Sequence, residues 1–331
     1  MTTLRYSAAL LLALSSGAAA QVDASGRSCP GGADDVRTAA LSGIAQLESD
    51  QVMPVLRKIL DRRDDCSISL RRQVISMLTR SRYGDQTDAL LGVARSDPSI
   101  EVRRAALNAI SQWNTDRAAA ALDSIVFSAG EPDLRDAALR ALAQHTAPSA
   151  RQSLHHAAEL TTLPMDLRVR AISYTSSGRK YPDESQYLTN LYAKSDSPEI
   201  RDAVMRAVAN QHAPESTAWL LSIARDKSRD IDHRRQALSA VAQAARSSDR
   251  SGTPMDIKSL LGLYDDFAGQ VEMQDRILDV IAQMPNVEAT DKLLQVAKSE
   301  TNVDLRRKAV LRVGQRRDPR VRDFLLDVLS K

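Results

Sequence analysis

The chain has 331 residues, more than one compact domain usually holds, so two domains or an elongated repeat array are expected. Hydrophobic residues make up 43% of it and aromatic residues only 4%, so Ala, Leu, Val and Ile must fill the core. The 45 basic and 42 acidic residues nearly cancel, which argues against a nucleic-acid-binding protein with its concentrated basic face.

The first segment predicts export. Arg5 precedes an apolar run over residues 8–14, and small residues end at Ala18-Ala19-Ala20, before Gln21. This pattern is typical of a secretory signal peptide at residues 1–20. The apolar run is too short to span a membrane, although a retained anchor is the alternative interpretation. We therefore expect an exported protein, in the periplasm or outside the cell and of bacterial origin.

Residues 21–32 form an N-terminal segment that holds Cys29, one of the two cysteines in the chain. Export permits a disulfide between Cys29 and Cys66. It would close a loop of about 37 residues and contribute roughly 3–4 kcal/mol to stability. Two free thiols are the alternative. Neither cysteine has a histidine near it in sequence, which argues against a catalytic thiol.

From residue 33 to residue 331, one amphipathic helix recurs nine times. Each copy has an anchor residue, and successive anchors are 32–34 residues apart except for one spacing of 40. An acid stands two residues before the anchor in eight copies, and the residues three, four and seven after it are nearly always apolar. These three offsets share one face of an α-helix. The anchors are Arg37, Arg71, Arg103, Arg135, Arg168, Arg201, Arg234, Gln274 and Arg306.

The acid and the arginine of each copy have different expected roles. The acid lies in the first helical turn, where a carboxylate meets the positive end of the helix dipole. The arginine lies on the apolar stripe and cannot pair well with an acid two residues away. We therefore expect the eight anchor arginines to reach neighbouring repeats and form an Arg–carboxylate ladder. Side chains that simply point to solvent are the alternative.

A second helical stretch follows each anchored helix, such as TDALLGVARS from Thr87. Neither helix can bury its apolar face alone, so the pairs must stack. The runs DPSIEVRRAALNAI at Asp97–Ile110 and DSPEIRDAVMRAV at Asp196–Val208 resemble the HEAT repeat family. They are most similar to its short bacterial repeats, sometimes labelled phycobilisome-lyase-like. The resemblance covers residues 33–331 and implies an all-α solenoid of about nine stacked antiparallel helix pairs, a HEAT-like superhelix.

Two stretches near the end of the array are irregular. The spacing of 40 comes from ARSSDRSGTPMD, which predicts a longer loop at residues 245–256. This loop is either a binding element or a tolerated surface insertion. The last helix is expected to cap the stack, with Phe324, Leu325 and Leu329 facing inward.

A polar column stands nine residues after the anchors, and six of its nine members are Gln in a chain with 17 Gln in total. At 100° per residue, this column lies opposite the core side of the helix. The HEAT resemblance implies a concave surface lined by one helix of each pair. The column either hydrogen-bonds an extended partner there, or caps helix ends and bridges repeats. The candidate partner-binding residues are Gln112, Gln144, Asn210, Gln243 and Gln283.

The five histidines do not form a metal-binding pattern. His155 and His156 are adjacent on a helix and point about 100° apart, while His145 and His212 follow helices two units apart. A phosphate-binding Gly-rich loop and a nucleophile–His–acid motif are both missing from the sequence. We expect no catalytic residues, cofactor or metal.

The sequence thus predicts an exported, non-catalytic scaffold or adaptor that binds a protein partner along its concave face. It predicts no nucleic-acid partner and no membrane span. The first alternative is a lyase-like or enzyme-associated HEAT protein. The second is a self-associating structural protein of the envelope.

Overall fold

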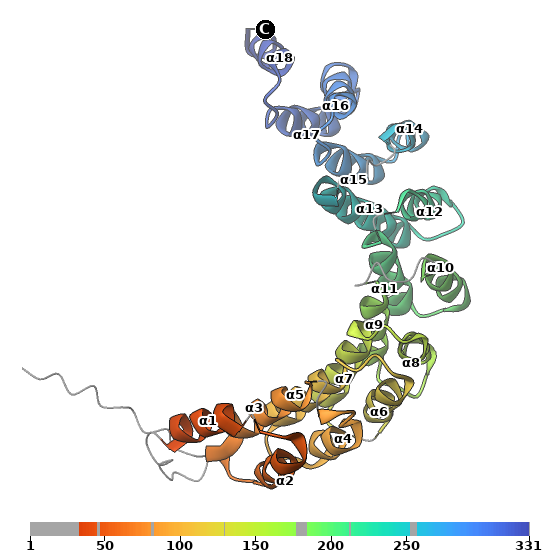
Figure 1. Ribbon diagram of the computed structural model, residues 1–331. Helices are drawn as coiled ribbons and strands as arrows, with labels where there is room; N and C mark the ends of the chain where they lie inside the picture. The colour runs from red at the N-terminus through yellow and green to blue at the C-terminus, as the bar shows by residue number, and fades with distance from the viewer. Residues whose placement is uncertain are drawn as a thin grey trace, which may run out of the picture. The chain divides into compact units, whose positions relative to one another are not determined.

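The computed structural model describes residues 33–44, 47–80, 83–128, 130–176, 184–211, 213–251 and 257–330. These residues form eighteen α-helices and one short 3-10 helix, η1 (Asp65–Ser67), and they contain no strand (Figure 1). The predicted signal peptide and the segment with Cys29 lie outside them. Cys66 is half-buried in η1, and its disulfide with Cys29 stays a prediction.

Each of the nine anchors lies on its own helix, and a second helix follows each one. The anchored helices are α1 (Ala33–Ile44), α3 (Ile68–Leu78), α5 (Ile100–Ile110), α7 (Pro132–Gln144), α9 (Met165–Thr175), α11 (Pro198–Ala209), α13 (Ile231–Ser251), α15 (Val271–Ala282) and α17 (Val303–Val313). The second helices are α2 (Ser49–Leu60), α4 (Thr87–Ser96), α6 (Asp116–Val126), α8 (Pro148–Glu159), α10 (Glu184–Lys194), α12 (Pro214–Arg225), α14 (Ile257–Asp266), α16 (Val287–Ser299) and α18 (Pro319–Ser330). The predicted all-α array of nine helix pairs is confirmed.

The chain forms two compact units, Met1–Ile125 and Val126–Lys331. In the first unit, α1, α3 and α5 pack side by side in one row, and α2 and α4 each pack on the anchored helix that follows. In the second unit, the anchored helices α7 to α17 form one row, and α12, α14 and α16 pack in a second row (Figure 1). Each unit is therefore built of two layers of helices.

The helix starts follow from local chemistry. In seven of the repeats the acid lies in the first turn, as expected, at Glu101, Asp133, Asp166, Glu199, Asp232, Glu272 and Asp304. Some helices also have a capping side chain. The hydroxyl of Ser197 accepts the amide of Ile200 at 3.3 Å, and Pro198 occupies the first turn of α11. Local sequence thus sets where the helices begin.

The apolar stripe of the anchored helices fills the space between the two layers. Ala106, Leu107 and Ile110 on α5 are all fully buried, and so are the corresponding residues of α15. Burying one large aliphatic side chain contributes about 1.5–3 kcal/mol relative to leaving it exposed. In most repeats, the offsets of three, four and seven residues from the anchor therefore mark the core, as predicted, whereas Ala40 is exposed and Val310 is half-buried.

Helix α13 runs on to Ser251, so residues 245–251, which the sequence predicts as part of a loop, are helical. Residues 252–256 lie outside the described part of the chain. The reason for the longer helix is that the strong helix breakers in this stretch, Gly252 and Pro254, come only after Ser251. In a helix interior, Gly costs about 1 kcal/mol and Pro about 3 kcal/mol relative to Ala.

Helix α18 buries Phe324 as predicted, but Leu329 is 83% exposed and Leu326 is 61% exposed. The inward orientation predicted for Leu329 is wrong, because no described helix packs over that side of α18. None of the described helices combines the length and apolar character that crossing a membrane requires.

Candidate binding surface

The anchor side chains reach the C-terminal end of the preceding helix. Three arginines donate through Nε–H to a main-chain carbonyl: Arg135 to Val126 at 2.7 Å, Arg168 to Ala158 at 3.0 Å and Arg234 to Ala224 at 3.0 Å. Gln274 donates to the carbonyl of Tyr264 at 3.5 Å, and Arg306 donates to that of Glu300 at 3.3 Å. The last carbonyls of a helix lack internal partners and lie at the negative end of its dipole. These anchors therefore cap the helix before them.

Arg71 binds a carboxylate. Its Nε lies 3.0 Å from Oδ2 of Asp97, and both side chains are fully buried. Its Nη1 also donates to the carbonyl of Asp64 at 2.8 Å. Asp97 lies between α4 and α5, so this ion pair ties α3 to the connection that leads into the next helix pair. At Arg135, Arg168 and Arg234, the acceptor is a carbonyl instead of the carboxylate that the sequence led us to expect.

Arg201 differs from these two arrangements. Nη2 of Arg201 lies 3.5 Å from the exposed carboxylate of Asp196, and its guanidinium lies 5.8 Å from the ring centroid of Tyr192. Arg37 and Arg103 are half-buried on α1 and α5. The eight arginines thus occupy equivalent positions without sharing one kind of acceptor.

The candidate partner-binding column lies on the side of the anchored helices away from the core. Gln112, Gln144, Asn210 and Gln283 are exposed, and Gln243 is half-buried. The side-chain amide of Gln243 donates to Oδ1 of Asn210 at 2.8 Å, which joins α13 to the residue that ends α11. The amide of Gln112 makes only a long hydrogen bond, 3.4 Å, to the carbonyl of Asn108. The column therefore bridges repeats at Asn210 and Gln243 and stays exposed at Gln112.

Shallow grooves separate neighbouring anchored helices. The groove between α3 and α5 is lined by Ser69, Arg72, Gln73, Ile75, Ser76, Thr79, Ala105, Asn108, Ala109 and Gln112. The groove between α1 and α3 is lined by Thr38, Leu41, Ser42, Gln73, Ser76, Met77 and Arg80. In the second unit, the groove between α13 and α15 is lined by Asp232, Arg235, Gln236, Ser239, Glu272, Asp275, Arg276 and Asp279. We refer to the exposed side of the anchored helices within each unit as the anchored-helix surface.

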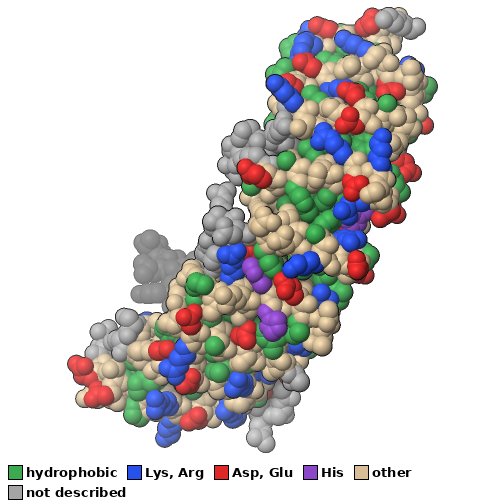
Figure 2. Space-filling model, turned by 90° about the vertical axis from the view of Figure 1, so that its right-hand side faces the viewer, with side chains coloured by type: hydrophobic (Ala, Val, Ile, Leu, Met, Phe, Trp, Pro, Cys, Tyr) green, Lys and Arg blue, Asp and Glu red, His purple; other side chains and the backbone are tan. Residues whose placement is uncertain are grey.

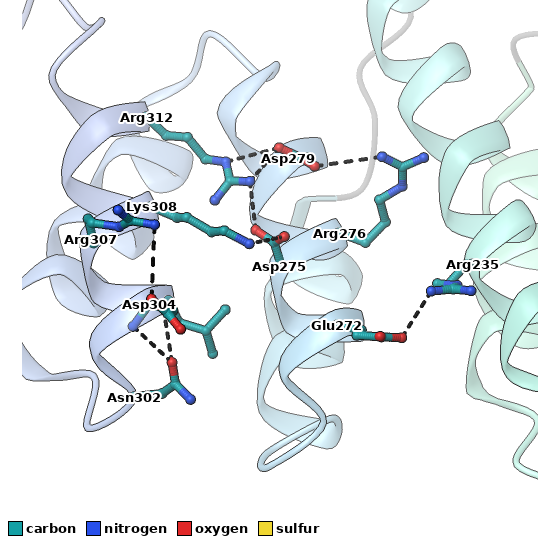
Figure 3. A network of polar contacts seen from close by, with 11 residues as sticks. Arg235, Glu272, Asp275, Arg276, Asp279, Asn302, Asp304, Arg307, Lys308 and Arg312 are labelled. Carbon is teal, nitrogen blue, oxygen red and sulfur yellow. Dashed lines mark hydrogen bonds and ion pairs between the residues drawn. The ribbon is translucent and has the colours of Figure 1, made fainter.

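Ion pairs join α13, α15 and α17 across the anchored-helix surface of the second unit (Figure 3). Glu272 lies 2.9 Å from Nη1 of Arg235, and Asp275 contacts Lys308 at 2.5 Å and Arg312 at 2.8 Å. Burial alone would raise the pKa of Asp275, but the hydrogen bonds from Lys308 and Arg312 hold that pKa below its ordinary value. These carboxylates are thus engaged by cations from the same surface.

A second network, which sequence reasoning missed, joins α7 to α9. Buried Asp136 accepts from Arg140 at 2.9 Å, from Arg170 at 3.1 Å and from the hydroxyl of Tyr174 at 3.0 Å. The one feature of the sequence that points to this network is the position of Asp136 directly after the anchor Arg135. Its partners lie up to 38 residues away, so only the packing of α7 on α9 brings them together.

Second helices of the array carry side chains of mixed charge. Figure 2 views the molecule from the side on which α10, α12 and α14 lie, and acidic and basic side chains are interspersed there. That side offers no broad field of one sign over the atoms that the figure colours.

The described histidines are built into the helical framework. His155 contacts Glu184 at 2.7 Å and stacks on Tyr187, and Nδ1 of His145 accepts the amide of Ala147 at 3.1 Å. His212 lies outside the described residues. Among the described residues, no group of three His, Cys, Asp or Glu side chains is placed to hold a metal ion.

Comparison with known proteins identifies HEAT repeats in part of the chain. Residues 87–172, from the start of α4 into α9, match the family model for HEAT repeats, and the predicted resemblance is confirmed there. The same anchors and stripes continue through the other helix pairs. No curated protein sequence matches the chain.

Several solved structures are distantly similar to the chain. YibA of Escherichia coli is 15% identical, with a TM-score of 0.38 over 85% of this chain and 97% of that one. The CpcE–CpcF complex of phycocyanin lyase from a Nostoc species is 14% identical, with a TM-score of 0.31 over 78% and 92%. Importin beta is 12% identical, with a TM-score of 0.39 over 86% and 45%. At TM-scores below 0.5, these three likenesses bear on neither fold nor function.

Replacing Arg71 by Ala is expected to lower the free energy of unfolding by about 3–5 kcal/mol, because it leaves the buried carboxylate of Asp97 with only the half-exposed Arg63, 3.6 Å away, as a cationic partner. Arg72→Ala is the matched control on the same helix. Arg72 pairs with Glu101 at 3.2 Å, but both side chains are more than half exposed, so a loss of only about 0–1 kcal/mol is expected. Urea unfolding measures both, and equal losses would show that the buried pair has no special role.

Replacing Arg168 by Met keeps the aliphatic stem but removes the donor to the carbonyl of Ala158. A hydrogen bond from a charged group contributes about 1.5–3 kcal/mol, so the melting temperature is expected to fall. The melting temperature of Arg168→Gln is expected to fall less, because Gln274 makes the corresponding contact in its own repeat. If the Met and Gln variants melt together with the unchanged chain, the capping role of the anchor is wrong.

Buried His233 predicts a loss of stability in acid. Its Nε2 lies 2.7 Å from the hydroxyl of Tyr192, and burial lowers the pKa of His233 below its ordinary value of 6.5. The nearby charges are Asp230 and Asp202, which raise this pKa, and Arg229 and Arg201, which lower it. Because the unfolded chain binds this proton more tightly, stability is retained above the unfolded pKa and is lost as the pH falls through the folded pKa.

The test compares melting temperatures of the unchanged chain and of His233→Gln between about pH 7.5 and about pH 5. The unchanged chain is expected to lose more thermal stability over this range than the variant. Parallel curves would mean that His233 does not contribute to the acid sensitivity.

Proposed function

We propose that this protein is a non-catalytic scaffold or adaptor that is exported to the periplasm and binds a protein partner along the anchored-helix surface. The observation that carries this proposal is the position of the grooves. Those between α1 and α3, between α3 and α5 and between α13 and α15 all lie between neighbouring anchored helices. In the first unit, a partner that crosses α1, α3 and α5 meets a groove at each successive repeat.

The repeat architecture supports the same proposal. Residues 87–172 are HEAT repeats, and stacked repeats of this kind form extended surfaces that bind other proteins. The core side of each anchored helix is occupied by the apolar stripe. Its opposite side is free to vary, and it carries amides, hydroxyls and charges at regular intervals.

The chemistry of the grooves suits recognition. Gln73, Asn108 and Gln112 each offer both a hydrogen-bond donor and an acceptor, as a polypeptide main chain requires. Ser76 adds a hydroxyl group of the same dual character, and the hydroxyl of Thr79, which donates to the carbonyl of Ser76, adds an acceptor. These side chains can bind a partner without altering its covalent structure.

Export is proposed from residues 1–20, whose basic start, short apolar run and Ala-x-Ala end are typical of a cleaved signal peptide. Export to the periplasm implies that the proposed partner is found there as well.

A photo-crosslinking amino acid at Gln112, Gln144 or Gln283 of the full chain, expressed in its native cells, is expected to capture the same partner at all three positions. The matched controls are Gln152 on α8 and Gln295 on α16, which are also exposed glutamines but lie on second helices. They should capture little. Mass spectrometry of the cross-linked species identifies the partner, and the protein is expected in the periplasmic fraction with Gln21 as its first residue.

Capture only from Gln152 and Gln295, or from none of the five positions, would contradict binding along the anchored-helix surface. Capture of a second copy of this chain would favour the self-associating alternative. An uncleaved chain in the cytoplasm would contradict export alone.

A further inference from the structure

The anchored-helix surface of the first unit is one continuous surface on both sides of α3. Gln73 and Ser76 line both the groove toward α1 and the groove toward α5. Neighbouring helices pack about 8–10 Å apart, and an extended chain advances about 3.3 Å per residue. A segment of roughly six residues, lying across the helices, therefore spans this surface from α1 to α5.

The lining of these two grooves combines polar groups with arginines. It includes Arg72, in the N-terminal half of α3, and Arg80, two residues beyond the end of α3, and no acidic residue. Arg104 is exposed on α5, at the position that corresponds to Arg72 on α3. Glu101, in the first turn of α5, is an acid that contacts this lining, through its ion pair with Arg72. The described surface thus carries more positive than negative charge.

The ion pair of Arg72 is easily exchanged. Its Nη1 lies 3.2 Å from Glu101, but the two side chains are 55% and 62% exposed. A pair this exposed contributes about 0–1 kcal/mol, so a carboxylate from a partner can replace Glu101 at little cost. Arg80 is also exposed, just beyond the end of α3.

The corresponding groove of the second unit has the opposite composition. Between α13 and α15, four acids face two arginines. Its carboxylates are already bound within the surface, since Asp275 contacts Lys308 and Arg312, and Glu272 contacts Arg235 (Figure 3). The positive character therefore belongs to the first unit and is not a general property of the repeats.

We propose that the surface formed by α1, α3 and α5 binds an extended, acidic polypeptide segment. Gln73, Ser76 and Asn108 hydrogen-bond its main chain, and Arg72 and Arg80 pair with its carboxylates. Charge-assisted hydrogen bonds from arginine to carboxylate are stronger than neutral ones and fix the position of the segment. This inference rests on the proposed protein-binding function and names the chemistry of the partner at one end of the array.

In the test, a display library of random peptides is selected for binding to the full mature chain. The peptides have about twelve residues, which is long enough to cross the surface and leave flanking residues at both ends. The expected peptides are rich in Asp and Glu and are lost on the Arg72→Gln, Arg80→Gln double variant. They should be retained on Arg235→Gln, Arg276→Gln, which changes net charge equally in the other unit. For a synthetic acidic peptide from the selection, fluorescence anisotropy should show Kd raised about tenfold by the first double variant.

A control peptide in which Asn replaces every Asp and Gln replaces every Glu is expected to bind at least about tenfold more weakly. A higher salt concentration is expected to weaken the binding of the acidic peptide. The proposal would be overturned if no peptide is recovered or if the recovered peptides are neutral or basic. It would also be overturned if acidic peptides bind the Arg72→Gln, Arg80→Gln variant as tightly as the unchanged chain. Equally tight binding of a thymidine oligonucleotide through the same arginines would show general polyanion binding and overturn it too.

These outcomes can be told apart from failure of the proposed function. A partner that cross-links at Gln112 through a neutral or basic segment leaves the protein-binding function standing and overturns only its acidic chemistry here. Absence of cross-links along all anchored helices overturns both.

Discussion

The helices of this protein cannot bury their apolar stripes within a single pair, and most of the structure follows from that constraint. On α5, the stripe of Ala106, Leu107 and Ile110 becomes fully buried only because α3 and α4 pack against it. Each anchored helix therefore needs its predecessor and a second helix, which produces two rows in each unit. Because one side of an anchored helix is used for packing, the opposite side is left exposed to solvent.

Close stacking also creates a polar requirement, which the anchors meet. The C-terminal carbonyls of each second helix lie against the next anchored helix, where water cannot solvate them freely. A long guanidinium reaches these carbonyls from a position ten residues further along the chain, as Arg168 and Arg234 do. Gln274 makes the same contact with a shorter side chain and at a longer distance, 3.5 Å. The anchor arginine therefore belongs to the packing framework of the repeats.

The same framework supports two surfaces of different chemistry. In the second unit, acidic side chains such as Asp136 and Asp275 are bound by arginines and lysines from adjacent helices, which orders the surface and neutralises it. In the first unit, hydroxyls and amides accompany Arg72 and Arg80 without acids in the grooves. A repeat array can vary its surface in this way because exposed side chains such as Arg72 and Gln112 take no part in packing the core.

The sequence by itself determined the helix pairs, their number, the acid at each helix start and the apolar stripe. Offsets of three, four and seven residues lie on one helix face whatever the helix packs against. Tertiary structure decided the partners of the anchors, because the acceptor depends on where the preceding helix ends in space. It also decided which polar side chains meet, as Gln243 and Asn210 do across 33 residues, and which exposed arginines lie in one groove. Such contacts depend on the positions of neighbouring helices. Those positions are set by side-chain packing between repeats, and the sequence of one repeat alone does not specify them.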